Sequence, residues 1–519
     1  MRGEENRTTA PAPANRAAIT ISIMLATIMQ ALDTTIANVA LPHIQGSLSA
    51  AQDQVTWILT SYIVAAAIMT PLTGWLAGAF GIKRVFLASV AGFTVASALC
   101  GAAQSLGQIV AFRLLQGACG AALVPLSQAV LLRINPPERH GQAMAVWGTG
   151  IMVGPILGPV VGGWLTDNYD WRWVFYINLP VGIVAFLGIF AFIRETRQTQ
   201  RERFDFLGFV ALSIAIGALQ LLLDRGQLKD WFGSIEIWIE ALVAGLAFYL
   251  FVVHTMTTRE RAFLNPDLLR DRNFMAGIVL MFFISIILFA TLALLPTMMQ
   301  QLMNYPVVTT GLATAPRGIG TMIAMFLVGR IINRIDIRLI LLVGLGLTAL
   351  SLAQMSGFSL LMGMSPIVVS GFIQGFGLGL VFVPLSTISF ATLSRSVLTQ
   401  GTAVFSLMRN IGSSIGISIV EALLIQNTQT VHARLVENLR PDNPLLQSPH
   451  HFPAPFSLHT TLGIEALNAL VNRQAAMVAY IDDFKFMMIV VLLAVPLLLL
   501  LRKPRQAGAR GPSGPAPRD

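Results

Sequence analysis

A few ionisable and polar residues stand inside long apolar segments of the sequence, where each could bind a proton or a substrate. Asp33 lies in the stretch Leu32–Pro42, next to Thr34, Thr35 and Asn38. An ionised carboxylate in hydrocarbon is costly, so this acid must be protonated, paired or hydrated. An acid that changes its protonation state is what a proton-coupled carrier needs. The alternative is a structural acid bonded to a neighbouring helix.

Arg113 is the natural partner of Asp33, because it too lies inside an apolar segment. A buried guanidinium requires a carboxylate or carbonyl partner. We therefore predict that these two residues act together in proton coupling, with a purely structural pair as the alternative. Other polar residues of the apolar segments could line a pathway or pair structurally: Asn38, Gln116, Arg317, Arg409 and Glu421.

A stretch rich in glycine and proline predicts a helix that is both closely packed and bent. Its glycines recur every four residues and so give the helix one flat face. Two Gly-Pro pairs within about six residues would bend it. Generic small-residue packing explains the glycines, but it explains the two pairs less well. The residues are Gly150, Gly154, Pro155, Gly158, Pro159, Gly162 and Gly163.

A short loop between two apolar segments combines small and basic residues. The small residues let two helices and a tight turn pack closely, and the cations anchor the cytoplasmic side. A plain basic loop is the alternative. The residues are Gly74, Gly78, Gly81, Lys83 and Arg84.

The composition shows which elements carry these residues. Of the 519 residues, 55% are hydrophobic and 11% are charged, whereas a soluble domain carries about 25% charged residues. The mean hydropathy is +0.70. The apolar segments reach the roughly 20 residues that a helix needs to cross a bilayer. They lack the alternation of β-barrel strands. We therefore predict an all-α polytopic membrane protein.

Fourteen apolar spans can be counted, and the basic residues gather in alternate loops and at both ends of the chain. Since cytoplasmic loops are enriched in Lys and Arg, both termini are predicted to be cytoplasmic. The net charge of +9 lies in these short loops and does not indicate a nucleic-acid groove. The spans are 17–41, 54–79, 84–105, 108–133, 141–166, 173–193, 205–223, 235–254, 274–302, 308–330, 337–358, 366–392, 400–425 and 484–501.

An internal repeat divides the spans into two halves. Pro71–Gly74 and Phe326–Gly329 open similar patterns, and Gln116–Gly117 is matched by Gln374–Gly375. Both matches are displaced by eight spans, as expected for two six-span halves around an inserted pair. The predicted regions are a disordered tail at 1–16, an N-terminal six-helix bundle at 17–193, an inserted pair with its loops at 194–272, a C-terminal bundle at 273–501 with a long outer loop at 426–482, and a basic tail at 502–519.

Several chemistries lack their sequence signals. The chain contains no phosphate-binding loop, so ATP is not expected to be its energy source. No Cys and His cluster has metal-ligand spacing, and Cys100 and Cys119 are expected to be unpaired thiols. We expect no cofactor, no metal and no nucleic-acid partner, and no catalytic constellation indicates an enzyme.

At these residues the chain resembles the major facilitator superfamily, and within it the fourteen-span drug:proton antiporters of the EmrB type. The resemblance is carried by Leu32–Pro42, Gly150–Gly163, Trp171–Gly182 and Leu223–Gly226. It implies a core of twelve helices in two bundles with an extra pair at the side. One departure is Gly78, where the superfamily usually has an acid, and this puts the usual cytoplasmic charge lock in doubt.

The resemblance also implies function. Asp33 would be the proton-linked acid, Arg113 its basic partner, and Gly154–Gly163 the helix that shapes exchange. The family exports hydrophobic compounds from the bacterial inner membrane in exchange for protons. EmrB-type permeases work with a periplasmic adaptor and an outer-membrane channel, for which the segment 426–482 would be a docking element. We thus predict a proton-driven drug exporter that uses alternating access, surrounded by membrane lipid.

Three alternatives remain open on the sequence. The same fold could export one dedicated compound, such as a siderophore, a fatty acid or an antibiotic. It could instead take up a substrate by proton symport, against which the Gly-Pro pairs argue. An intramembrane enzyme or a receptor-like scaffold would need a catalytic constellation, which the sequence lacks.

Overall fold

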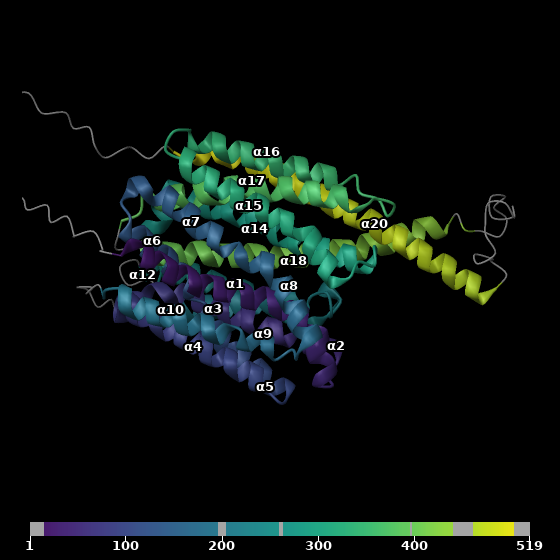
Figure 1. Ribbon diagram of the computed structural model, residues 1–519, viewed down its shortest axis with the longest axis horizontal. Helices are drawn as coiled ribbons and strands as arrows, with labels where there is room; N and C mark the ends of the chain where they lie inside the picture. The colour runs from purple at the N-terminus through teal and green to yellow at the C-terminus, as the bar shows by residue number, and fades with distance from the viewer. Residues whose placement is uncertain are drawn as a thin grey trace, which may run out of the picture.

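The computed structural model describes residues 15–195, 204–258, 263–394, 397–437, 439 and 460–502. Every regular element within these ranges is a helix (Figure 1). Fourteen helical segments of the described chain are long and apolar enough to cross a membrane. The predicted all-α architecture and the predicted number of spans are therefore confirmed. Most of the two expected tails, and residues 440–459 of the expected outer loop, lie outside the described residues.

The N-terminal bundle contains the first six spans, three of which are interrupted helices. Short breaks at Ala121, Met152 and Ile177 divide the fourth, fifth and sixth spans into two helices each. The elements are α1 (Arg16–Ser47), α2 (Gln52–Val55), α3 (Trp57–Phe80), α4 (Ile82–Ala102), α5 (Leu106–Gly120), α6 (Leu123–Ile134), α7 (His140–Ile151), α8 (Val153–Asn168), α9 (Trp173–Tyr176) and α10 (Asn178–Phe192).

The seventh and eighth spans form an antiparallel pair at the side of the molecule. These are α11 (Phe206–Arg225) and α12 (Ile235–Thr258), joined by a short turn that includes η2 (Trp231–Gly233). α11 packs against α3 and α18, whereas α12 packs chiefly against α11. Apolar side chains of α12 are therefore exposed, as expected for a helix that faces lipid.

The C-terminal bundle contains the last six spans. Its helices meet the N-terminal bundle where α7 and α8 pack on α15, and where α3 and α6 pack on α18. The elements are α13 (Pro266–Arg270), α14 (Arg272–Gln301), α15 (Val307–Ile331), α16 (Ile337–Met355), α17 (Met364–Phe390), α18 (Leu398–Val436), α20 (Thr461–Ala494) and η5 (Val495–Leu500).

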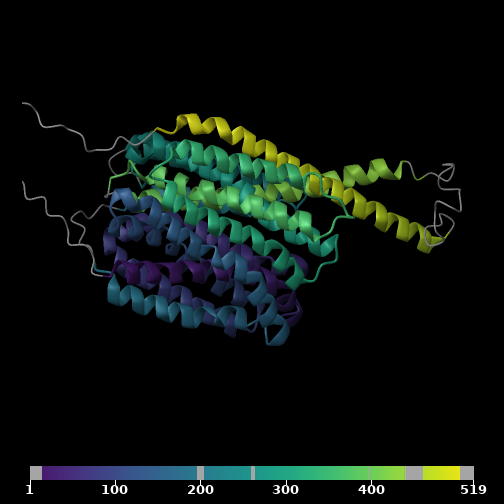
Figure 2. The ribbon, with the colours of Figure 1, turned by 45° about the horizontal axis from the view of Figure 1, so that its top comes forward.

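The segment 426–482 differs from the expected loop. Figure 2 shows two long helices protruding beyond the body of the protein, where α18 continues to Val436 and α20 begins at Thr461. His432 and Asn468 connect the two extensions over 2.9 Å, and Leu467 is buried. These extensions mix polar and apolar residues, so a search for continuously apolar segments does not find them.

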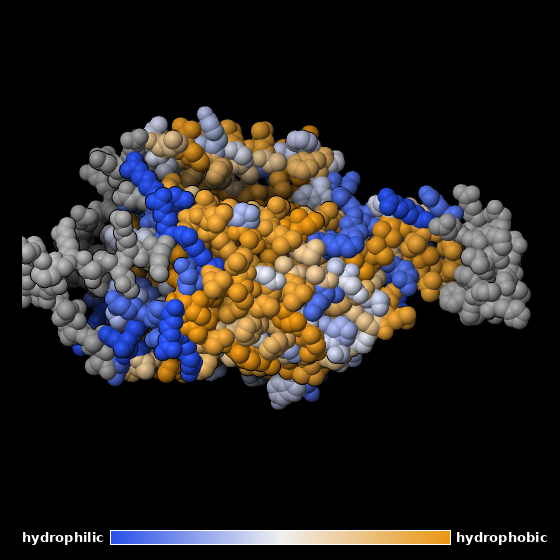
Figure 3. Space-filling model, turned by 90° about the horizontal axis from the view of Figure 1, so that it is seen from above, coloured by the Kyte–Doolittle hydropathy of each residue, from blue (hydrophilic) through white to orange (hydrophobic). Residues whose placement is uncertain are grey.

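The surface of the body is divided into zones along the helix axes. Figure 3 shows a broad apolar belt with hydrophilic side chains gathered on both sides of it. The first and last described helical residues lie at one end of the bundle (Figure 1), which we call the terminal face; the opposite end is the distal face. The cytoplasmic location of the terminal face stays a prediction from the distribution of basic residues.

Candidate functional site

Asp33 and Arg113 form a buried ion pair inside the N-terminal bundle. α1 carries the acid and α5 the base, and Nη1 of Arg113 lies 2.7 Å from Oδ2 of Asp33. The side chains of Asp33 and Arg113 are 0% and 1% exposed, respectively. The structure thus brings together the two residues that the sequence suggested as partners.

Two amide side chains complete the shell around the Asp33 carboxylate. Gln116 Nε2 and Asn178 Nδ2 each donate a hydrogen bond to Oδ1 of Asp33 over 2.8 Å. Asn178 also donates to Ser97 Oγ over 3.0 Å, and Ser97 in turn donates to the carbonyl of Phe175. Side chains of α5 and α10 therefore fix the position of this carboxylate, and Ser97 of α4 accepts a hydrogen bond from the Asn178 amide.

The Arg113 guanidinium also has several partners besides Asp33. Its Nε donates to the carbonyl of Ile58 over 3.2 Å, and its Nη1 also donates to Oε1 of Gln116 over 2.8 Å. The rings of Tyr62 and Phe175 lie 4.4 and 5.7 Å from its central carbon. Aromatic faces attract a desolvated cation, so protein groups surround both charges of the pair.

The glycine-rich stretch sets the position of α1, because α8 packs directly on it. A Cβ added at Gly154 would lie 2.6 Å from Cβ of Ala31 and 2.9 Å from its backbone carbon. Gly158 and Gly162 face Thr35 and Ile36 in the same way. These glycines therefore form a flat face on α8. The residues of α1 that this face contacts lie on both sides of Asp33 in the sequence.

The other residues of this stretch also contribute to the shape of the span. The span breaks at Met152, Pro155 follows in the first turn of α8, and Pro159 lies inside that helix. Gly150 faces Met24 of α1, and Gly163 is buried.

The predicted loop motif lies at the terminal face. Gly81 has a backbone φ of 90°, a left-handed value that favours glycine, where α3 turns into α4. Lys83 donates to the carbonyl of Phe190 over 2.7 Å, while the exposed Arg84 lies 3.8 Å from Glu195. These contacts anchor the loop within the N-terminal bundle. Gly78 is half-buried.

The two bundles contact each other at the terminal face. A Cβ added at Gly74 would lie 3.0 Å from Cα of Gln400 in α18. Arg133 donates to Thr399 Oγ1 over 3.0 Å, and Asn333 donates to the carbonyl of Glu138 over 3.0 Å. In this state the terminal ends of the bundles are held together by neutral and charged hydrogen bonds.

The other polar residues proposed for a pathway are dispersed. Gln116 belongs to the Asp33 shell, and Asn38 is exposed on α1. Arg317 is buried and donates to the carbonyl of Leu288. Arg409 contacts Asn410 at 3.5 Å, and Glu421 is exposed on the same helix, α18. Arg409 and Glu421 are 12 residues apart, about 18 Å along an α-helix, so they do not form a pair.

Sequence reasoning missed several residues that matter at the site. Tyr62 and Ser97 gave no signal, because neither is unusual in an apolar span. Asn178 lies in the stretch Trp171–Gly182 that carries the family resemblance, but no role was predicted for its side chain. A buried polar side chain within a membrane helix requires a hydrogen-bond partner, and this argument could have linked Asn178 with Asp33.

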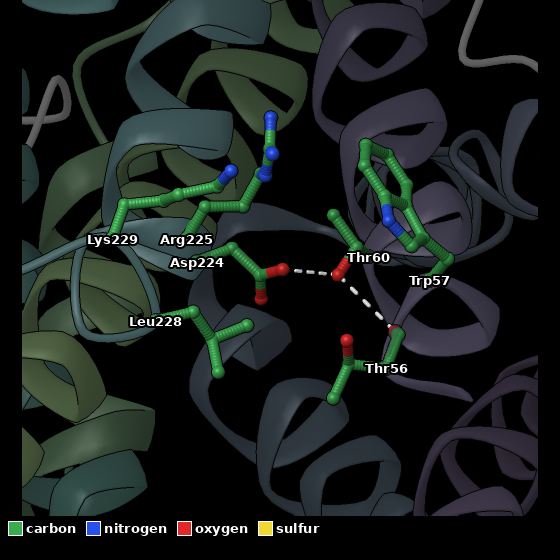
Figure 4. Close-up of a pocket in the computed structure, with 7 residues that line it drawn as sticks. All are labelled: Thr56, Trp57, Thr60, Asp224, Arg225, Leu228 and Lys229. Carbon is green, nitrogen blue, oxygen red and sulfur yellow. Dashed lines mark hydrogen bonds between the residues drawn. The ribbon is translucent and has the colours of Figure 1, made fainter. Parts of the chain in front are cut away.

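A pocket of about 220 Å³ lies at the distal face, where α11 meets α3. Figure 4 shows Asp224 directed towards Thr60, whose hydroxyl donates to the carboxylate. Arg225 and Lys229 also line this pocket, and both pair with Glu236 of α12. α3 thus connects the inserted pair with the Asp33 site.

Within the described ranges, no group of three or more His, Cys, Asp or Glu residues is arranged to hold a metal ion. Cys100 and Cys119 are free thiols, as expected.

Comparisons with known proteins bear on the family and the fold of the chain. A family model described as Major Facilitator Superfamily matches residues 23–417. The chain is 36% identical to a multidrug export protein EmrB of Haemophilus influenzae over 85% of this chain and 87% of that protein. It is 34% identical to the fatty acid resistance protein FarB of Neisseria gonorrhoeae, over 95% and 97%.

A solved structure extends the comparison to the fold. The proton:xylose symporter XylE matches with a TM-score of 0.60 at 12% identity, covering 95% of this chain and all of that chain. At this identity the likeness concerns the fold alone.

Proposed function

Since this chain belongs to the EmrB-type multidrug efflux permeases of the major facilitator superfamily, we propose that it exchanges protons for the hydrophobic compounds it exports. The observation that carries the proposal is the fully buried Asp33, which is bonded to Arg113, Gln116 and Asn178. A chain of this family and fold is a multi-pass membrane transporter, and nothing in the site requires bond-making chemistry.

The coupling that we propose acts through the charge of Asp33. Protonation of the carboxylate removes one charge of the ion pair and leaves Arg113 without its counter-charge. A buried cation without a partner is costly, so the N-terminal bundle then favours an arrangement in which Arg113 finds other acceptors. A drug that binds the two arrangements unequally couples its own movement to the proton.

Alternating access needs two bundles that can rock against each other. The contacts at the terminal face, among them Arg133 with Thr399, are mostly single hydrogen bonds. A hydrogen bond contributes about 0.5–1.5 kcal/mol between neutral groups and about 1.5–3 kcal/mol where one group is charged, so these contacts can break in every cycle. The terminal face would be closed in this state, and drugs would enter from that side after it opens.

The setting that we propose is a bacterial inner membrane with both termini in the cytoplasm. The curated relatives named above are bacterial, and the basic loops support this orientation. The extensions of α18 and α20 would then project into the periplasm. We propose them as the docking element for a periplasmic adaptor that leads to an outer-membrane channel.

The first experiment follows ethidium leaving energised cells that carry the protein or its Asp33→Asn variant at matched expression. We expect the unmodified protein to export the dye until a protonophore is added, and Asp33→Asn to lower the rate at least tenfold. Asp167→Asn alters an exposed acid at the end of α8 and should stay within about twofold. Normal export by Asp33→Asn would remove this acid from the mechanism.

A dedicated exporter of one compound is the second candidate. The observation in its favour is the relative named for fatty acid resistance, which matches over nearly the whole of both chains. A panel of cationic dyes, weak acids and long-chain fatty acids would separate the two proposals. Export of a single class would favour the dedicated carrier, and export of several classes would favour the multidrug exporter.

A further inference from the structure

A second buried carboxyl lies in the C-terminal bundle, far along the chain from Asp33. Asp483 of α20 is 0% exposed, and neither of its carboxylate oxygens has a hydrogen-bond partner among the described residues. The hydroxyl of Tyr480, one turn earlier on the same helix and also buried, is likewise unpartnered within the described chain. Asp33 differs in that both of its carboxylate oxygens accept hydrogen bonds.

The charges around Asp483 are negative or neutral. On its own helix it interacts electrostatically with Tyr480 and Asp482, and Tyr480 also interacts with Glu421 of α18. Asp482 is half-exposed and already pairs with Lys485 over 3.1 Å.

The other helices packed on α20 are α14, α16 and α18. The titratable side chains of α14 and α16 are Arg272 and Arg338, which lie in the first turns of these helices. The basic residues of α18 stand 11 or more residues from Glu421 along that helix, more than about 16 Å away. They are Arg409, His432 and Arg434. No basic side chain of the described residues donates a hydrogen bond to the Asp483 carboxylate.

The internal repeat places this acid close to the counterpart of the Asp33 site. Gln116 donates to Asp33, and the matching Gln374 donates to Thr291 of α14 over 3.2 Å. Thr291 thus occupies in the second half the place of the acid in the first. Its hydroxyl contacts Sδ of Met487 at 3.6 Å, and Asp483 lies one helical turn from Met487. In the C-terminal bundle the buried acid, Asp483, therefore lies on α20, next to the helix α14 that carries Thr291.

We propose that Asp483 is a second proton-binding site of the transporter, loaded from the distal face by way of Glu421 and Tyr480. An ionised carboxylate without partners in an apolar site costs several kcal/mol, and such a group takes up a proton instead. In this buried arrangement Asp483 would therefore hold a proton. Glu421 lies on the surface of α18 and interacts electrostatically with Tyr480, so it would serve as the outer carboxylate of this route. This inference rests on the proposed proton exchange.

The test uses the purified full-length protein in lipid vesicles, with two assays of drug movement. In the first, a pH gradient drives the drug; in the second, labelled drug exchanges for unlabelled drug at equal pH on both sides. Asp483→Asn should lower gradient-driven transport at least tenfold and leave exchange within about twofold. Asp483→Glu, which keeps an ionisable carboxyl, should restore much of the driven transport.

Asp482→Asn is the matched control, because it makes the same change one residue away at a half-exposed site. It should leave both assays within about twofold. Unchanged driven transport in Asp483→Asn would overturn the proposal. Loss of both assays in that variant would overturn it too, because it would mark a structural role. If the unmodified protein showed no driven transport, the proposed proton exchange itself would fail.

A measurement on the unmodified protein decides the matter if Asp483→Asn does not fold. Dicyclohexylcarbodiimide reacts with protonated carboxyl groups in apolar surroundings and can be located by peptide mass spectrometry. We expect labelling at Asp483 that falls as the pH is raised, and little at Asp482. The absence of labelling at Asp483 at low pH would overturn the proposal, whatever the transport assays show.

Discussion

Asn178, the first residue of α10, donates a hydrogen bond to the carboxylate of Asp33 in the middle of α1 over 2.8 Å. The same amide also donates to Ser97 of α4 over 3.0 Å. A single side chain therefore links three helices of the N-terminal bundle at the proposed proton site. Since both residues are buried, this link cannot be replaced by water without opening the bundle.

Removing the Asn178 amide should lower the free energy of unfolding, because one hydrogen bond to the Asp33 carboxylate is lost. Asn178→Ala leaves the Asp33 Oδ1 with Gln116 as its one remaining donor, and an under-satisfied buried acceptor costs about 1–3 kcal/mol of unfolding free energy. Thermal unfolding in detergent would measure it. Asn168→Ala is the control, because Asn168 is exposed and bonds only within its own helix; it should change stability by less than about 0.5 kcal/mol. Equal effects of the two substitutions would contradict the proposed role.

Arg113 should be needed for stability only while Asp33 carries a charge. Arg113→Leu leaves a buried carboxylate unpaired and should cost about 3–5 kcal/mol. Adding Asp33→Asn removes that charge, so the double variant should regain much of the stability and still fail to couple transport to protons. Unfolding curves and gradient-driven transport of all four proteins form a double-mutant cycle. Recovery of driven transport in the double variant would refute proton coupling through this pair.

The contact between α8 and α1 should not tolerate a single added methyl group. In Gly154→Ala the new Cβ meets Ala31 at 2.6 Å, so α1 must shift and move Asp33 with it. Overpacking of this kind costs about 1–3 kcal/mol, and we expect driven transport to fall. Gly245→Ala is the control, since a Cβ there meets nothing within 4 Å. It should be neutral or stabilising by up to about 1 kcal/mol. A fully active Gly154→Ala would exclude tight packing as the function of this glycine.

Much of the fold could be predicted from the sequence because the membrane imposes a simple rule. A segment must be apolar over about 20 residues to cross it, and the fourteen spans follow from that. The rule does not cover helix outside the bilayer. The end of α18 and the beginning of α20 were therefore expected as part of a loop, although α18 and α20 pack on each other as helices. Asp483 was placed at a loop boundary for the same reason, and its burial was missed.

The candidate site was predictable where the cost of burial was high. A carboxylate and a guanidinium inside apolar spans each require a partner, which pointed to Asp33 and Arg113 together. The neutral members of the shell carry a smaller penalty, so Tyr62, Ser97 and the role of Asn178 could not be found in this way. Arg317 shows the limit of the argument, because a backbone carbonyl serves as its acceptor. No sequence pattern reveals such a partner.

The hydrogen bond between Thr60 and Asp224 should hold the inserted helix pair against the N-terminal bundle. Thr60→Val removes the donor, and loss of a bond to a charged group costs about 1.5–3 kcal/mol. We expect lower thermal stability and more proteolysis around α11. Thr257→Val is the control, since its hydroxyl bonds only within α12. If Thr60→Val behaved like this control, other contacts of α11, such as Ser418 with the carbonyl of Leu223, would have to hold the pair.

Alternating access requires α7 and α15 to separate at the terminal face, and a disulfide can test this directly. A Cβ added at Gly329 would lie 2.9 Å from Cβ of Ala145, and a disulfide needs about 3.5–4.5 Å between these atoms. A small shift would therefore allow Ala145→Cys and Gly329→Cys to cross-link in a background without Cys100 and Cys119. Oxidation should stop driven transport, and reduction should restore it, whereas the two single-cysteine proteins should not respond. If the cross-linked protein kept its transport rate, the bundles would not need to part at this contact.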